Sequence, residues 1–165
     1  MPPLPLSLAA MAASIALITD LRSRRIPNWL TLSALLAGIS VNLWLHGVDG
    51  GLQALAGAAI GFAVLIPFYA IHAVGAGDVK LLAAIGALVG PVGLVPVAVY
   101  GGIVGGILSL FLLAKHGRLT FTVQQALMMR MVPAQSGIKA PYAVAIAGGV
   151  YLALVPALSS FLVGT

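Results

Sequence analysis

The sequence predicts an all-α integral-membrane protein, a polytopic bundle of about six transmembrane helices, and three observations support this prediction. Hydrophobic residues make up 61% of the chain and charged residues only 7%, whereas a soluble domain carries roughly 25% charged residues. The mean hydropathy is +1.14. The apolar residues form long runs separated by charged or glycine-rich breaks, as in a chain that crosses a bilayer repeatedly. The 165 residues suit one compact bundle, so we expect a single integral-membrane domain over residues 1–165.

The first predicted span runs from Leu4 to Thr19. No positively charged segment precedes it and cations follow it, so we interpret it as a retained span rather than a secretory signal. The other predicted spans run from Trp29 to His46, Leu52 to Val74, Val79 to Val89, Gly93 to Ala114 and Pro141 to Leu162.

Turn-forming residues separate some of these spans. The loop from His46 to Gly51 contains an Asp-Gly pair, and the boundary from Gly90 to Gly93 contains a Gly-Pro pair, so we expect a turn at each. The stretch from Leu119 to Gly137 mixes apolar and polar residues, which is typical either of a helix lying on the membrane interface or of a long loop.

The distribution of the cations indicates the orientation of the predicted bundle in the membrane. With the N-terminus outside, all eight Lys and Arg residues fall on one side, which the positive-inside rule assigns to the cytoplasm. They are Arg22, Arg24, Arg25, Lys80, Lys115, Arg118, Arg130 and Lys139. We therefore predict a multi-pass protein of the cell's inner membrane with both termini outside. The net charge of +5 follows from this topology and does not indicate a nucleic-acid partner.

Only three carboxylates are present, Asp20, Asp49 and Asp78, and there is no glutamate. An acid at the edge of a membrane segment is energetically costly and usually marks a functional site. The predicted topology puts Asp20 and Asp78 on the cytoplasmic face and Asp49 on the opposite face, where it is interpreted as part of a turn. A pair of acids on one face is the minimum that an aspartic protease needs.

The segment Gly75-Ala-Gly-Asp78 precedes the fourth span and has two interpretations. One is a glycine-rich turn in which Asp78 is the N-cap of the following helix. The other is functional, with Gly75 and Gly77 allowing a substrate backbone to approach the carboxylate.

The segment from Asp20 to Asn28 follows the first span and also has a structural interpretation. In that interpretation Asp20 pairs with Arg24, Pro27 ends the loop and Asn28 caps the next helix. The positive-inside rule accounts for the arginines but not for an acid, so Asp20 is left unexplained.

Two segments, taken together, resemble the motifs of the prepilin peptidase family. They are Asp20 with Arg25-Ile-Pro27-Asn28, and Gly75-Ala-Gly77-Asp78-Val-Lys80. The members of this family are intramembrane aspartic proteases of the Gly-x-Gly-Asp type. A third element, Pro141-Tyr142, is similar to the segment that opens the family's last helix. The resemblance extends from about Asp20 to Gly149, and in size the chain is most similar to the short peptidases of tight-adherence (Flp, type IVb) pili.

The resemblance implies a function and a set of site residues. Asp20 and Asp78 would be the catalytic acids, and the substrate would be a prepilin with a short cytoplasmic leader followed by a hydrophobic helix in the bilayer. Residues in a substrate-binding or supporting role would be Gly75, Gly77, Lys80, Arg25, Pro27, Asn28, Pro141 and Tyr142. Lys80 would meet an acidic group of the mature pilin or tune Asp78, although membrane orientation alone also accounts for it.

No cofactor and no metal are expected. The chain has no cysteine, so the cysteine-containing domain of the larger, N-methylating family members is missing, and methyltransferase activity is not predicted. The three histidines lie near predicted span ends and are interpreted as interfacial.

Several other functions remain open on the sequence. An archaeal preflagellin peptidase would have the same two acids and a different substrate. A small proton-coupled transporter would use the acids as a relay, and a non-catalytic membrane subunit would tolerate their replacement. Presenilin-like proteases share Gly-x-Gly-Asp but lack the Arg25-Ile-Pro-Asn28 loop.

Overall fold

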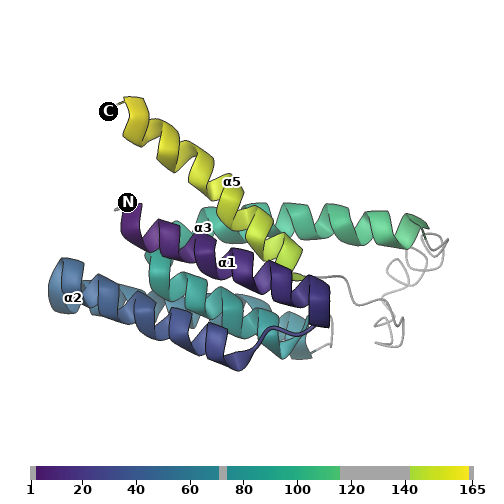
Figure 1. The fold of residues 1–165 in the computed structure, drawn as a ribbon, viewed down its shortest axis with the longest axis horizontal. Helices are drawn as coiled ribbons and strands as arrows, with labels where there is room; N and C mark the ends of the chain where they lie inside the picture. Colours follow the sequence, from purple (N-terminus) through teal and green to yellow (C-terminus); the bar gives the residue numbers. More distant parts are fainter. Residues whose placement is uncertain (1–2, 71–73, 116–141, 164–165) are drawn as a thin grey trace.

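The computed structural model describes residues 3–70, 74–115 and 142–163, and these form a bundle of α-helices (Figure 1). The helices are α1 (Pro3–Ser23), α2 (Asn28–Ala70), α3 (Ala76–Lys115) and α5 (Tyr142–Val163). Three stretches are long and apolar enough to cross a membrane, namely Leu4–Ser23, Asn28–Ala70 and Ala76–Ser109. The prediction of an all-α membrane bundle is confirmed.

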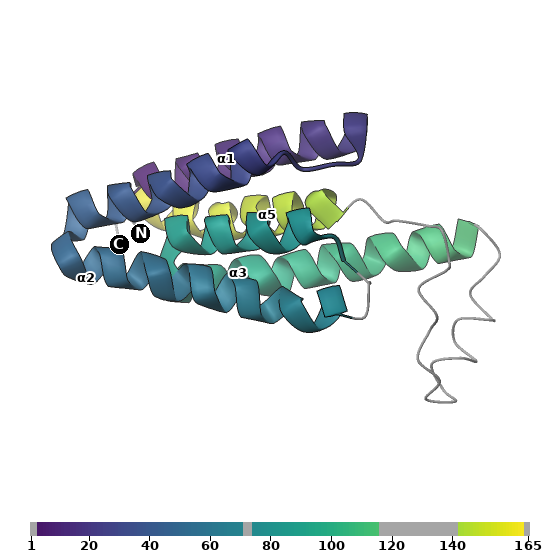
Figure 2. The same ribbon diagram turned by 90° about the horizontal axis from the view of Figure 1, so that it is seen from below.

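Helices α2 and α3 each reverse direction at a single glycine (Figure 2). Gly47 has φ 64° and Gly90 has φ 72°, a left-handed conformation that glycine adopts without a Cβ penalty. The described residues therefore form six helical segments: 3–23, 28–46, 48–70, 76–89, 91–115 and 142–163. These segments correspond to the six apolar runs of the sequence; the number of membrane crossings stays a prediction.

The two predicted turns are wrong in length. The loop expected from His46 to Gly51 is a break at Gly47 alone, and Asp49 lies in the helical segment that resumes after it. The turn expected from Gly90 to Gly93 is likewise a break at Gly90, and Pro91 opens the next segment, where its fixed φ and missing N–H are tolerated. One glycine with positive φ is enough to reverse the chain, so no longer loop is needed.

The reversals sort the helix ends into two groups at opposite ends of the bundle. The described ends of the chain and the bends of α2 and α3 lie at one end, on the left in Figures 1 and 2, which we call the bend end. The C-terminal ends of α1 and α3 and the starts of α2, α3 and α5 lie at the other end, which we call the acid end. Asp20 and Asp78 are near the acid end, and Asp49 follows the bend of α2. The stretch 119–137 lies outside the described residues.

Helix α3 forms the centre of the bundle and packs against the other three helices. Five of the largest fully buried side chains belong to it: Leu81, Ile85, Leu88, Leu94 and Val97. Glycines allow the neighbouring helices to pack closely on this core. A Cβ at Gly57 of α2 would collide with the backbone of Gly86 of α3, and a Cβ at Gly86 would collide with Gly57. This packing through small residues is typical of helices in lipid.

The Asn42 side chain supports the reversal of α3. Its Nδ2 donates to the carbonyl oxygens of Gly38 at 2.9 Å and of Ala87 and Leu88 at 3.0 Å each. The Ala87 carbonyl has no helical donor four residues later because Pro91 lacks an N–H. Asn42 therefore satisfies carbonyl groups that the break at Gly90 leaves without a helical partner.

The contact between Gly57 and Gly86 predicts a large effect of a single methyl group. Gly86→Ala would place a Cβ under 3.0 Å from the backbone of α2, and we expect a loss of about 1–3 kcal/mol of stability, the usual cost of overpacking. The measurement is thermal unfolding in detergent. Gly102→Ala is the control, because its Cβ would meet nothing within 4 Å; equal melting temperatures for the two variants would contradict the prediction.

Candidate active site

Asp78 lies in the first turn of α3, where the local backbone fixes its carboxyl group. The carbonyl oxygen of Gly75 accepts hydrogen bonds from the N–H groups of Asp78 at 3.1 Å and Val79 at 3.4 Å. In return, Asp78 Oδ2 accepts from the N–H of Gly75 at 3.0 Å. The bond to Asp78 Oδ2 is one half of a capping box, in which the third helical residue accepts from the N-cap N–H; Gly75 has no side chain to supply the other half. The interpretation of Asp78 as the N-cap is therefore corrected: Gly75 occupies that position, and Asp78 is the third residue of the helix.

The two glycines before Asp78 have packing roles in this arrangement. A Cβ at Gly75 would lie 3.1 Å from Asp78 Oδ2, and a Cβ at Gly77 would lie 3.1 Å from the Cβ of Ile26. Glycine at both positions lets the carboxyl group and the loop after α1 approach the backbone closely. The space beside Gly77 is filled by the chain itself, which is a reason for glycine that the sequence did not reveal.

Asp20 lies in the last turn of α1, immediately before that loop. Its carbonyl oxygen accepts from the N–H of Arg24 at 2.7 Å, and Arg24 has φ 50°, so the helix ends in a left-handed cap on a residue other than glycine. The charge of Arg24 acts on the Asp20 carboxylate through space, whereas the pairing of the two side chains stays a prediction. Asp20 Oδ2 is nevertheless buried without a hydrogen-bond partner among the described residues.

The first turn of α5 is close to both acids. The backbone amide of Ala143 interacts with the carboxylate of Asp20, and the Tyr142 side chain lies within the electrostatic reach of Asp78. A backbone N–H in the first turn of a helix has no helical acceptor and favours a nearby anion. Sequence reasoning identified Tyr142 but missed the amide of Ala143; the only signal was that a helix was expected to start there. Pro141 lies outside the described residues.

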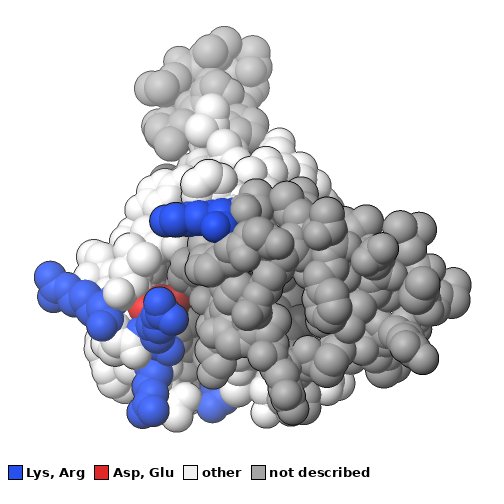
Figure 3. Space-filling model, turned by 90° about the vertical axis from the view of Figure 1, so that its right-hand side faces the viewer, with Lys and Arg blue, Asp and Glu red and all other residues white. Residues whose placement is uncertain are grey.

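The fold brings Asp20 and Asp78 together. They come from different helices, both are partly buried, and the charge of Asp20 acts on Asp78. In the view onto the acid end, acidic residue surface appears beside Lys and Arg residues (Figure 3). Two carboxylates held near one another do not both ionise easily, so such a pair favours a state that shares one proton.

The matching family model is that of the type IV leader peptidase family, and it matches residues 7–110. The chain belongs to this family. The matched region contains most of α1, all of α2, most of α3 and both acids. No curated protein and no solved structure matched the chain.

In this type IV leader peptidase, the loop after α1 is attached to the start of α3 at two points. Ile26 packs on Gly77, and Lys80 Nζ donates to Asn28 Oδ1 at 3.0 Å. The expectation that Asn28 caps α2 is corrected, because Asn28 is already the first residue of the helix. The carbonyl oxygen of Pro27, the residue before it, accepts from the N–H groups of Leu30 at 3.1 Å and Thr31 at 3.4 Å. The Asn28 side chain contacts α3 instead, while Arg25 is exposed at the acid end.

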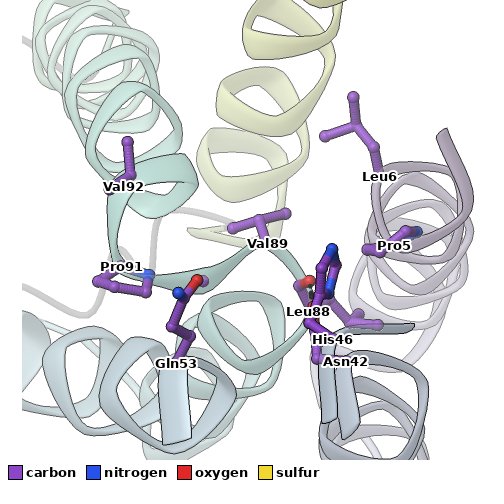
Figure 4. A pocket seen from close by; sticks show the side chains of 10 residues that line it. Pro5, Leu6, Asn42, His46, Gln53, Leu88, Val89, Pro91 and Val92 are labelled. Atoms are coloured by element: carbon purple, nitrogen blue, oxygen red, sulfur yellow. Dashed lines mark hydrogen bonds between the residues drawn. The ribbon is translucent and has the colours of Figure 1, made fainter. Parts of the chain in front are cut away.

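A cavity of about 230 Å³ lies far from the two acids, at the bend end of the peptidase (Figure 4). The side chains of His46 and Gln53 from α2 point into it, next to the bend of α3 at Val89 and Pro91. Because the acids lie at the other end of the bundle, this cavity does not belong to the candidate active site.

The hydrogen bond between the Gly75 N–H and the Asp78 side chain predicts different effects of two substitutions at Asp78. Asp78→Ala removes the acceptor for the Gly75 N–H, so we expect a loss of about 0.5–2 kcal/mol of stability, as for other helix caps. Asp78→Asn keeps a side-chain oxygen and should retain most of that stability. Thermal unfolding in detergent measures the difference, and equal losses in the two variants would contradict the capping role.

The contact between Lys80 and Asn28 predicts that the two side chains act together. Lys80→Met and Asn28→Ala should each lower the unfolding midpoint slightly, by no more than about 1 kcal/mol because the pair is exposed. The double variant should lose no more than either single variant. Lys115→Met, which removes an equal charge from the other end of α3, is the control; additive losses at Lys80 and Asn28 would rule out the contact.

Proposed function

We propose that this chain is a prepilin leader peptidase that uses Asp20 and Asp78 as an acid/base pair on the short cytoplasmic leader of type IVb (Flp) prepilins. The single observation that carries the proposal is the position of the two acids at the same end of the bundle, Asp20 in the last turn of α1 and Asp78 in the first turn of α3. The charge of Asp20 acts on Asp78 there. Membership of the type IV leader peptidase family supports the leader as substrate.

In the proposed reaction, one carboxylate acts as general base and takes a proton from water, and the resulting hydroxide attacks the scissile carbonyl carbon. The other, protonated carboxyl group donates its proton to the carbonyl oxygen, and a proton is later delivered to the leaving amine as the C–N bond breaks. Asp20 Oδ2 has no protein partner among the described residues and is suited to hold the water. Asp78 Oδ2 is bound to the Gly75 amide, which fixes its orientation.

The surroundings of the two acids suit a substrate that approaches from the cytoplasm. Exposed cations lie at the acid end on α1, on the loop after it and at both ends of α3: Arg22, Arg24, Arg25, Lys80 and Lys115. The positive-inside rule then assigns this end to the cytoplasm and the protein to the inner membrane. The hydrophobic helix of a prepilin would lie in the bilayer with its leader at this end.

The position of the acids also argues against a proton relay. A transporter that carries protons through the bilayer needs ionisable groups along its path. Asp20 lies in the last turn of α1 and Asp78 in the first turn of α3, so neither lies in the middle of a helix.

The decisive prediction concerns processing of a prepilin in cells. With a candidate prepilin co-expressed, wild type should remove the leader, and Asp20→Asn or Asp78→Asn should each slow removal by about 10²–10⁴-fold, the contribution of a general acid or base. Leader loss is followed by mobility shift. Asp49→Asn changes the carboxylate at the bend end of the bundle, away from the other two acids, and should leave processing intact.

Continued processing by either variant of the acid pair would contradict the mechanism. Replacing the prepilin with an archaeal preflagellin in the same assay tests the alternative substrate. Preferential cleavage of the preflagellin would overturn the assignment to pilins while leaving the two acids in place.

A further inference from the structure

The fully buried residues of helix α1, which carries Asp20, are alanines, and larger side chains such as Leu8, Ile15 and Leu17 are only partly buried beside them. Ala9, Ala13 and Ala16 have no exposed surface. Alanine faces let helices approach closely in lipid, but a methyl group offers little to interlock with the facing helix. The alanine face alone therefore holds α1 close without fixing its register along the neighbouring helix.

A hydrogen bond between side chains joins α1 to α5. The hydroxyl groups of Ser14 on α1 and Tyr151 on α5 are hydrogen-bonded to each other. Ser14 Oγ also donates to the carbonyl oxygen of Ala10 at 2.6 Å. A serine hydroxyl has a single hydrogen, and that of Ser14 is donated to Ala10. The Tyr151 hydroxyl is therefore the donor and the Ser14 oxygen the acceptor in the bond between the two helices.

The hydrogen bond between Ser14 and Tyr151 lies in the same interface between α1 and α5 as the contact between α5 and Asp20. From Ser14 to Asp20 is about 9 Å along α1, and from Ala143 to Tyr151 is about 12 Å along α5, at 1.5 Å per residue. The two helices run in opposite directions (Figure 1), so the two contacts belong to one antiparallel register. A slip at Ser14 would move the Ala143 amide away from the Asp20 carboxylate.

We propose that the hydrogen bond between Ser14 and Tyr151 is a positioning contact that holds the first turn of α5 against Asp20. Tyr151 acts on the reaction only through the placement of the Ala143 amide and the Tyr142 side chain beside the acids. The catalytic part of this proposal rests on the proposed function, whereas the positional part does not.

The positional part is tested by distance measurement without any substrate. The chain has no cysteine, so Leu21→Cys and Val144→Cys provide two spin-label sites, one beside Asp20 and one in the first turn of α5. Dipolar EPR in nanodiscs should give a narrow distance distribution for the otherwise wild-type chain, and Tyr151→Phe should broaden or shift it. Tyr69→Phe is the matched control, because Tyr69 on α2 is 49% exposed and Tyr151 is 47% exposed.

The catalytic part is tested by cleavage kinetics on a prepilin. Tyr151→Phe should lower kcat by about 3- to 20-fold, the range that corresponds to measured hydrogen bonds between membrane helices, with KM changed less than about twofold. Ser14→Ala should have the same effect, and the double variant should be no slower than either single variant, since both remove one contact.

The outcomes separate the two parts. An unchanged distance distribution in Tyr151→Phe would overturn the positioning contact whatever the activity. A shifted distribution with an undiminished kcat would overturn its role in the reaction. A wild-type chain that cleaves no prepilin would instead contradict the proposed function, and the EPR measurement would still decide the positioning contact.

Discussion

The reversal of α2 at Gly47 determines where Asp78 lies. A straight helix of 43 residues would be about 64 Å long and would carry the start of α3 far from the end of α1. The left-handed φ of one glycine instead sends the chain back, so α3 begins at the end where α1 finishes. The second reversal, at Gly90, returns the chain to the acid end, from which α5 also starts. The site therefore depends on two positions at which a residue with a Cβ would be strained.

Close packing of helices makes these reversals stable. Gly57 and Gly86 bring the backbones of α2 and α3 into contact, and Asn42 binds carbonyl groups that the break before Pro91 leaves free. In lipid there is little hydrophobic driving force between helices, so such backbone contacts and interhelical hydrogen bonds carry much of the association. The short segment with Asp78 is thus held on a central, well-packed helix rather than on a loop.

Much of the fold was predictable because the bilayer requires long apolar runs, and their boundaries are marked by charge, glycine and proline. The placement of Asp20 and Asp78 at one end follows from counting these runs. The lengths of the turns were not predictable, since a break at one glycine and a loop of several residues have the same sequence signals. The roles of Asn28 and Gly77 were also missed, because both depend on contacts between the loop after α1 and α3, and the Ala143 amide carries no side-chain signal at all.

Cross-linking tests directly whether the two acids are neighbours in the membrane. The chain has no native cysteine, so Asp20→Cys/Asp78→Cys can be treated with a short bifunctional thiol reagent in native membranes, with Asp20→Cys/Asp49→Cys as the control pair. We expect an intramolecular cross-link between positions 20 and 78 and none between positions 20 and 49. Failure of the first pair to cross-link, with both thiols shown to be reactive, would contradict this expectation.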